Sequence, residues 1–369
     1  MNVLSLFDGM SCGRVALERA GFTVTNYYAS EVDKYAIKVA MANYPETIQI
    51  GDVTKVSYKD GYLTTENGVF YVGQIDLLIG GSPCQGFSFA GKQLNFEDPR
   101  SKLFFEFTRL MKEIQPANFL LENVKMKQEC QDVISLYTGV QPIEINSALV
   151  SAQNRKRLYW TNLTIQQPED KGVLLQDIIQ QLDSVDKRFV LSENELSYMN
   201  RAVNGGRNHW DFGHHSSVEN EKSSCVVSNF SKGVPYNVLV DREKSFCITS
   251  SVGRTTMRES FYKNQGGVAF TKTVSRGDFS SVDGVSKIET IVNGIVRNES
   301  FKLKLPNGSY VVRKYTPIEC ERLQTLPDNY TNHVSSTQRY KMIGNGWTVD
   351  VISHIFKNLS VASQYHIAS

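Results

Sequence analysis

The first 160 residues alternate between short apolar runs and amphipathic stretches, and this alternation limits the possible folds more than any other feature of the sequence. The apolar runs are predicted to be strands, at 3–7, 23–29, 48–50, 75–81 and 119–121. The stretches between them have helical spacing, at 14–20, 33–43 and 103–114. Strands that alternate with helices form βαβ units, so the sequence predicts an α/β fold with a parallel, doubly wound sheet.

Polar side chains stand where these predicted strands end. They are Asp8, Glu31, Asp52, Cys84 and Glu122. Sheets of this kind bind ligands beyond the carboxyl ends of their strands. We therefore expect these five side chains to lie along one edge of the sheet and to form a site.

The middle of the chain has a different pattern. Short β-type runs occur at 225–227, 236–240, 246–249, 268–274 and 288–292, and the segment 222–276 carries an excess of Lys and Arg. Helical pattern returns at Thr316–Glu319, a capping box with Pro317 at the first helical position, and at 349–359. The sequence thus predicts an α/β domain made of 1–162 and 313–369, split by a β-rich insertion at 163–312.

Composition excludes several classes of protein. No apolar run approaches the ~18 residues of a membrane span, and the N-terminus has no visible signal peptide. The six cysteines are all at least 22 residues apart, which excludes CxxC zinc or redox motifs and favours a reducing cytoplasm. His209, His214 and His215 lack metal partners at useful spacing, so no metal site is expected. The net charge of +2 neither requires nor excludes a polyanionic partner.

The first predicted strand leads into FDGMSCG, residues 7–13, an FxGxxxG turn that opens a helix. Glycines in such a turn let a ligand approach the backbone closely. The chain has no GxGxxG, which a nicotinamide dinucleotide would require. Glu31 lies where an acid can accept from ribose hydroxyls, and Asp52 could accept from an adenine amino group. These residues indicate a nucleoside-like ligand, with purely structural turns as the alternative.

A sharper motif is GGSPCQGFS, residues 80–88. A thiol on a proline-flanked loop beyond a buried strand is placed for nucleophilic attack as the thiolate, which favours Cys84 as a nucleophile. Glu122 ends the neighbouring strand, where burial could keep its carboxyl group protonated and able to donate a hydrogen bond. The other late cysteines are expected to be small buried hydrophobic side chains, namely Cys130, Cys225, Cys247 and Cys320.

Residues 153–157, QNRKR, alternate cations on a predicted strand that continues into Tyr159. Arg155 and Arg157 would then point to the same face. Such a segment is either a solvated edge strand or a clamp for an anion or a carbonyl group, and the spacing leaves both open.

Taken in order, FDGMSCG, SEVD, GDV, GGSPCQGFS, ENV, QNRKR and IGNGWTV resemble the motifs of the DNA cytosine-5 methyltransferases. The resemblance covers 1–162 and 313–369, and the stretch 90–105 looks like bacterial and phage members. One departure is the first motif, where the family's usual FxGxGG is replaced by FxGxxxG, similar to the animal de novo branch. Ser11 and Cys12 therefore put the detailed cofactor contacts in doubt, but not the activity.

The resemblance implies a Rossmann-like methyltransferase sheet with S-adenosylmethionine as the cofactor. Phe7 would stack on the adenine, Glu31 would accept from the ribose hydroxyls, and Asp52 would accept from the adenine amino group. The full cofactor pocket would be Phe7, Gly9, Met10, Glu31, Val32, Asp52, Val53, Pro83, Leu103, Asn345 and Trp347. In catalysis Cys84 would be the nucleophile, Glu122 would contact the cytosine ring, and Arg155 and Arg157 would hold the flipped nucleotide.

The implied reaction is transfer of a methyl group to C5 of a flipped-out cytosine in double-stranded DNA, with 163–312 as the target-recognition domain. Two alternatives remain. A tRNA cytosine-5 methyltransferase resembles the same motifs but has a much smaller insertion, and a silent DNA-binding regulator would have no need for Cys84 and Glu122. The resemblance to prokaryotic and phage members raises a cognate restriction endonuclease as a candidate partner. The sequence determines neither that partner, nor the recognition sequence, nor the oligomeric state.

Overall fold

A computed structural model of the chain describes residues 1–82, 99–181, 184–189, 215–217, 222–223, 225–228, 238–242, 270–272, 286–292, 295–301 and 308–359. Pro83, Cys84, Cys247, His209 and His214 lie outside these residues, as does the predicted run at 246–249.

Seven strands of the described chain form one sheet in the order β3-β2-β1-β7-β8-β10-β9. From β3 to β8 the neighbours are parallel, whereas β10 is antiparallel to both β8 and β9. The predicted parallel α/β sheet is therefore confirmed, with an antiparallel end that was not predicted. The strand bounds are β1 (Asn2–Leu6), β2 (Asn26–Ser30), β3 (Ile48–Gln49), β7 (Leu77–Gly80), β8 (Asn118–Val124), β9 (Ile143–Asn146) and β10 (Lys156–Thr161).

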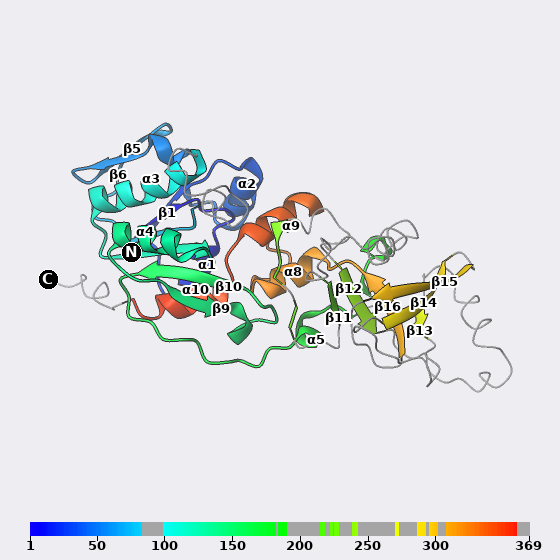
Figure 1. Cartoon of the computed structure of the whole chain (residues 1–369). Helices are drawn as coiled ribbons and strands as arrows, with labels where there is room; N and C mark the ends of the chain where they lie inside the picture. The colour runs from blue at the N-terminus through cyan, green and yellow to red at the C-terminus, as the bar shows by residue number, and fades with distance from the viewer. Residues whose placement is uncertain are drawn as a thin grey trace.

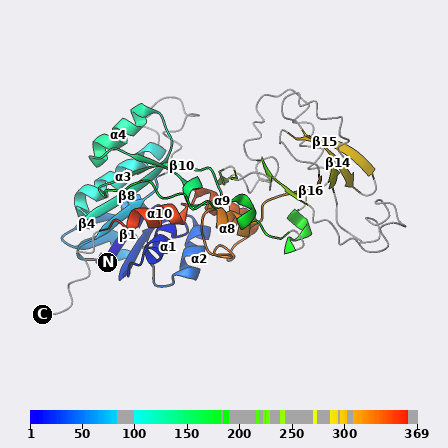
Figure 2. The same cartoon turned by 90° about the horizontal axis from the view of Figure 1, so that it is seen from below.

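Helices cover both faces of this sheet (Figures 1 and 2). On one face lie α1 (Cys12–Arg19), α2 (Lys34–Asn43) and α10 (Val349–Phe356), and on the other α3 (Pro99–Ile114) and α4 (Gln128–Thr138). Successive side chains of a strand point to opposite faces. In β1, Val3 packs in the α1–α10 cluster and Leu4 packs in the α3–α4 cluster. The strands read as continuous apolar runs because both faces are buried.

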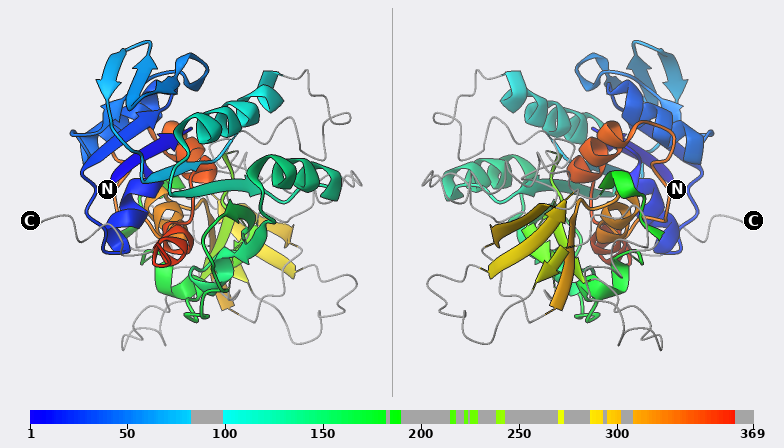
Figure 3. Two further views of the ribbon diagram at one scale, coloured as in Figure 1. Left: turned by 90° about the vertical axis from the view of Figure 1, so that its left-hand side faces the viewer. Right: turned by 90° about the vertical axis from the view of Figure 1, so that its right-hand side faces the viewer.

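A small antiparallel sheet between β3 and β7 was not predicted. It consists of β4 (Ser57–Lys59), β5 (Tyr62–Thr65) and β6 (Gly68–Tyr71), and Figures 1 and 3 show it at the outer edge of the lobe, beside α3. Its turn uses positive φ at Asp60 and Gly61, 50° and 85°. Sequence analysis did not predict this sheet because Leu63 is the one residue of its three strands that is fully buried, so none of these strands contributes a run of buried apolar residues.

A second sheet follows in the insertion, with the order β11-β12-β16-β13-β14-β15 (Figure 1). Its bounds are β11 (His215–Ser217), β12 (Val238–Arg242), β13 (Phe270–Lys272), β14 (Ser286–Val292), β15 (Ile295–Phe301) and β16 (Gly308–Arg313). The runs predicted at 236–240, 268–274 and 288–292 overlap β12, β13 and β14. The prediction of a strand at 225–227 was wrong, because this segment lies against the lobe of the seven-stranded sheet without joining any of the three sheets.

Three helices lie between the two sheets in Figures 1 and 2: α5 (Leu175–Ile178), α8 (Pro317–Leu323) and α9 (Ser336–Asn345). The predicted capping box is confirmed, since Thr316 Oγ1 accepts from Glu319 N at 3.2 Å and Glu319 Oε2 accepts from Thr316 N at 2.8 Å. Short 3-10 helices are η1 (Val53–Lys55), η3 (Ser147–Leu149) and η5 (Lys187–Phe189). No helix in the described part of the chain is long and apolar enough to span a bilayer.

The chain after residue 162 begins by packing on the first lobe. Ile165, Leu175, Phe189 and Val226 belong to the same hydrophobic cluster as α10. Lys222 strengthens this attachment, because its Nζ donates to the carbonyl oxygens of Ala148, Ser151 and Val173 at 2.9, 3.3 and 2.5 Å. The start of the insertion is therefore part of the core that supports the sheet.

Candidate active site

The acids that follow the parallel strands lie at the carboxyl edge of the sheet, as predicted. Asp8, Glu31 and Asp52 follow β1, β2 and β3, and Glu122 lies near the end of β8. Gly9 N donates to Glu31 Oε2 at 2.8 Å, so the turn after β1 and the end of β2 are in direct contact. The edge therefore gathers side chains that lie far apart in the sequence.

The turn between β1 and α1 has an unusual backbone. Phe7, Gly9 and Ser11 have φ values of 58°, 61° and 64°, a region that non-glycine residues seldom adopt. A Cβ built on Gly9 would meet nothing within 4 Å, so the backbone at this point borders open space. Backbone N–H groups at the start of a helix carry partial positive charge, which suits a polar ligand.

Asp8 is the hydrogen-bonding centre of this turn. Its carboxyl group accepts from the hydroxyl groups of Ser5 at 2.6 Å and Tyr27 at 2.7 Å, and also from Ser11. Burial raises the pKa of Asp8 from 3.8 to about 6, although the three hydroxyl donors act in the opposite direction. The sequence placed Asp8 at a strand end but gave no indication that it braces the turn.

Glu31 and Asp52 also organise their own loops. Glu31 Oε1 accepts from the backbone N–H groups of Val32 at 2.7 Å and Asp33 at 2.8 Å. Asp52 Oδ1 accepts from Thr54 N and Thr54 Oγ1, both at 2.9 Å. Both acids therefore have defined orientations before any ligand binds.

The other predicted cofactor residues surround this turn in different environments. Val32 is 72% exposed, which is unusual for an aliphatic side chain beside an oriented acid. Met10 and Val53 are buried, Asn345 is exposed, and Phe7, Leu103 and Trp347 are half-buried. An exposed apolar surface next to an acid and an open glycine fits a nucleoside, which needs a face for its base and an acceptor for its ribose. The residues present therefore fit the implied cofactor.

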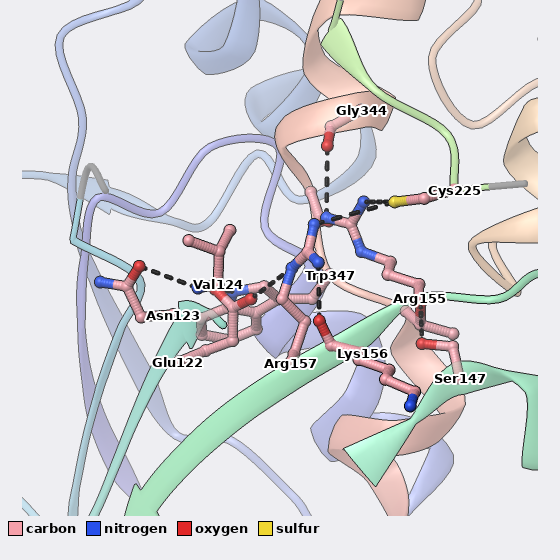
Figure 4. Close-up of polar contacts among 12 residues, drawn as sticks. Glu122, Asn123, Val124, Ser147, Arg155, Lys156, Arg157, Cys225, Gly344 and Trp347 are labelled. Atoms are coloured by element: carbon pink, nitrogen blue, oxygen red, sulfur yellow. Dashed lines mark hydrogen bonds and ion pairs between the residues drawn. The ribbon is translucent and has the colours of Figure 1, made fainter. Parts of the chain in front are cut away.

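Glu122 is 8% exposed and has a donor on each carboxyl oxygen (Figure 4). Trp347 Nε1 donates to Oε2 at 3.0 Å, and Arg157 Nε forms an ion pair with Oε1 at 3.2 Å. The predicted burial is confirmed. Both contacts use the carboxyl group as an acceptor, whereas the sequence suggested a protonated group that donates.

Arg157 lies on β10, between Val124 of β8 and Ile145 of β9. The edge-strand alternative for this segment is therefore wrong. Burial opposes the charge of Arg157, but the Glu122 carboxylate and the Cys225 sulfur outweigh it and raise the pKa of the guanidinium. The cation is consequently a permanent feature of the site.

Arg155 precedes β10 and is 3% exposed. Its guanidinium donates to three backbone carbonyl oxygens, those of Val226 at 2.8 Å, Gly344 at 3.2 Å and Gly346 at 2.9 Å. Arg155 thus joins the insertion and the turn after α9 to the sheet. The two arginines share one neighbourhood, because both guanidinium groups donate to the Cys225 sulfur (Figure 4).

Cys225 is the residue of this site that sequence analysis missed. It was expected to be a small buried hydrophobic side chain, but it is half-buried and its Sγ lies 3.2 Å from Arg155 Nη1. Ser223 brings it there by pairing with Ala152 and Asn154 through backbone hydrogen bonds of 2.7 and 2.9 Å. No sequence spacing could have revealed a contact between residues 70 positions apart.

Cys130 and Cys320 are buried, as expected, and Cys12 is buried as well. Burial raises the pKa of Cys12 to about 12, and it also raises the pKa values of Cys130 and Cys320. Cys12, Cys130, Cys225 and Cys320 are free thiols. Among the side chains that the structure describes, no group of three His, Cys, Asp or Glu residues could hold a metal ion.

Comparison with known proteins identifies the family. The sequence model described as C-5 cytosine-specific DNA methylase matches residues 1–133 and 145–361. The chain belongs to this family. It is therefore an enzyme of the DNA cytosine-5 methyltransferase type, as the resemblance implied.

Relatives match over nearly the whole chain. The orphan methyltransferase M.SPRI of Bacillus phage SPR is 26% identical over 97% of this chain and 97% of its own length. The type II methyltransferase M.HhaI of Haemophilus parahaemolyticus is 25% identical over 97% of this chain and 94% of its own. A solved Dnmt2 methyltransferase from S. pombe has a TM-score of 0.59 at 15% identity, with 98% and 99% coverage. A DNMT2 mutant from Spodoptera frugiperda has a TM-score of 0.58 at 21% identity, with 97% and 98% coverage, and these two structures support the fold.

Asp8 should make the stability of the fold depend on pH. The pKa of Asp8 in the folded protein, about 6, lies above the ordinary 3.8. The stability that its protonated carboxyl group gives the fold is therefore complete below about pH 3.8 and is lost as the pH rises through 6. Asp8→Asn stays neutral and should gain stability relative to the parent between those limits, by at most about 3 kcal/mol. Urea unfolding of both proteins across this range measures the difference. Asp186→Asn, at a side chain that is 57% exposed, serves as the control, and a constant difference between parent and Asp8→Asn would contradict the prediction.

Proposed function

We propose that this enzyme transfers a methyl group from S-adenosylmethionine to C5 of a flipped-out cytosine in duplex DNA, through a covalent bond between Cys84 and C6. The observation that carries the proposal is the fixed Glu122 carboxyl group beside the chain that leads to Cys84. A Cβ on Gly81 would lie 3.1 Å from Glu122 Oε2. Asn123 Nδ2 donates to the carbonyl oxygen and the hydroxyl group of Ser82 at 3.2 and 3.3 Å. The segment before Cys84 is thus held against Glu122 and Asn123.

The reaction explains why a thiol and a carboxyl group are needed. C5 of cytosine is a poor nucleophile until a group adds at C6, and the Cys84 thiolate would supply that addition. Glu122 would contact N3 and offset the charge that develops in the ring. S-adenosylmethionine would supply the methyl group that C5 takes. A base would then remove the C5 proton, and the thiolate would leave C6 as the ring regains its double bond.

The proposed cofactor residues are those that border the turn after β1. Glu31 would accept from the ribose hydroxyl groups, and Asp52 from the adenine amino group. Phe7 and Val32 would pack on the base. This assignment is supported by the exposed Val32, the open space at Gly9 and the preset orientation of Glu31. The remaining residues of the proposed pocket are Met10, Val53, Pro83, Leu103, Asn345 and Trp347.

A cytosine inside a duplex cannot reach such a site, so the target has to be flipped out of the stack. We assign Arg155 and Arg157 to holding that nucleotide. The contacts of Arg157 with Glu122 support a position beside the base. Arg155 would act mainly by holding the backbone around the site in place, because its guanidinium donates to three backbone carbonyl groups.

We assign the insertion at 163–312 to target recognition. The basic stretch 222–276 would contact phosphates, and base edges would supply the sequence reading. Relatives from bacteria and phages support a role in the cytoplasm of a prokaryotic or phage-infected cell, with a cognate restriction endonuclease as the candidate partner.

The substrate test compares nucleic acids directly. The parent protein incubated with labelled S-adenosylmethionine should label C5 of cytosine in duplex DNA and leave tRNA unlabelled. Cys84→Ala should abolish the transfer while cofactor binding persists, because this change removes only the covalent step. Labelling of tRNA alone would favour the tRNA methyltransferase, and absence of labelling with cofactor bound would favour a silent regulator. Activity of Cys84→Ala within tenfold of the parent would contradict the assigned nucleophile.

Glu31→Ala should weaken cofactor binding, because the ribose hydroxyl groups lose a charged acceptor. The loss should be about 1.5–3 kcal/mol, or roughly ten- to hundredfold in Kd. Calorimetric titration with S-adenosylmethionine measures it. The matched control is Glu46→Ala, which removes an acid that is 55% exposed and pairs with Arg14. Equal affinity of Glu31→Ala and the parent for S-adenosylmethionine would mean that Glu31 only stabilises its own loop and does not contact the cofactor.

A further inference from the structure

Glu122 is held by two side chains that differ in kind. Arg157 on the adjacent strand β10 pairs with Oε1 at 3.2 Å, and Trp347, 225 residues away in the chain, donates its indole N–H to Oε2 at 3.0 Å (Figure 4). The arginine supplies charge. The tryptophan supplies one neutral donor that has no capacity to accept, so it can meet the carboxyl group in only one way.

The surroundings leave room for this contact and little else. A Cβ on Gly81 would lie 3.0 Å from Trp347 Nε1 and 3.1 Å from Glu122 Oε2, so any side chain at 81 would crowd both partners. A Cβ on Gly13 would lie 3.4 Å from Trp347 Cζ3. The indole therefore fits between two glycines, Gly13 at the start of α1 and Gly81 just after β7.

The backbone that carries the indole is also fixed. Gly346 O accepts from Arg155 Nη2 at 2.9 Å, and a Cβ on Gly346 would lie 2.6 Å from Met10 Cε. The backbone next to the indole is thus held by Arg155, and the ring lies close to Gly13 of α1.

The terminal torsion of a glutamate is broad, so one contact at Oε1 leaves the plane of the carboxyl group poorly defined. A second donor at Oε2 defines that plane. We propose that Trp347 is a positioning residue for Glu122, which keeps the carboxyl group in the orientation that the cytosine ring requires. This role goes beyond packing against the cofactor, and it rests on the methyl-transfer function proposed above.

Trp347→Phe tests the role, because it keeps an aromatic ring and removes the N–H group. Since a misplacement of about 1 Å can cost roughly a hundredfold in rate, kcat for methylation of duplex DNA should fall about ten- to hundredfold, with KM for DNA and for S-adenosylmethionine within twofold of the parent. The matched control is Trp160→Phe, which removes another indole hydrogen bond, from Trp160 Nε1 to Ser135 Oγ at 3.0 Å, in the α3–α4 cluster. That variant should keep the parent kcat.

A double-mutant cycle separates positioning from general damage. If Trp347 acts through Glu122, adding Trp347→Phe to Glu122→Gln should lower kcat less than threefold further. Should Trp347→Phe fail to fold, a benzothienyl analogue of tryptophan at 347 keeps both rings and lacks the N–H group. A kcat within threefold of the parent, an effect confined to cofactor KM, or fully multiplicative losses in the double variant would each overturn the proposal. Failure of the proposed function would appear separately, as a parent protein that does not methylate DNA.

Discussion

The buried guanidinium of Arg155 holds together the parts of the chain on which the site depends. Its three carbonyl acceptors lie on the insertion, at Val226, in the last turn of α9, at Gly344, and just after that helix, at Gly346. An arginine with its planar donors can satisfy several carbonyl groups at once, which a lysine could not do with the same geometry. Removing it would leave Gly344 O without this donor, at a cost of about 1–3 kcal/mol. Val226 O and Gly346 O would keep only the longer contacts of 3.4 Å with Cys225 Sγ and Gln324 Nε2.

This arrangement places Glu122, Arg157 and Trp347 on elements that are joined to one another. Glu122 stands on a central strand, Arg157 on the antiparallel strand beside it, and Trp347 on the turn that Arg155 fixes. The turn between β1 and α1 is braced separately by Asp8 and connected to β2 through Glu31. The proposed catalytic carboxyl group and the turn proposed for the cofactor therefore both stand on the packed sheet, and the insertion is connected to that sheet through Val226.

Much of this could be predicted from local sequence. The apolar runs ending in Asp8, Glu31 and Asp52 predicted both the strands and the edge at which the acids meet, because parallel strands end on the same side. Three features could not be predicted. They are the position of β10 between β8 and β9, the contact of Cys225 with the arginines, and the hydrogen bond from Trp347 to Glu122. Each joins residues brought together by tertiary packing, which leaves no periodic mark on the sequence. The hairpin sheet β4–β6 was missed because Leu63 alone in its strands is fully buried.

Covalent attack by Cys84 on a flipped cytosine is the central claim, and duplex DNA with 5-fluorocytosine at the target tests it most directly. The thiolate can add at C6 and C5 can take the methyl group, but release would require fluorine to leave as a cation, which is prohibitive. We predict an adduct that survives denaturation, requires S-adenosylmethionine and maps to the peptide containing residues 81–87. An adduct on Cys12, Cys130, Cys225 or Cys320, or no adduct at a site proven to be methylated, would contradict the account.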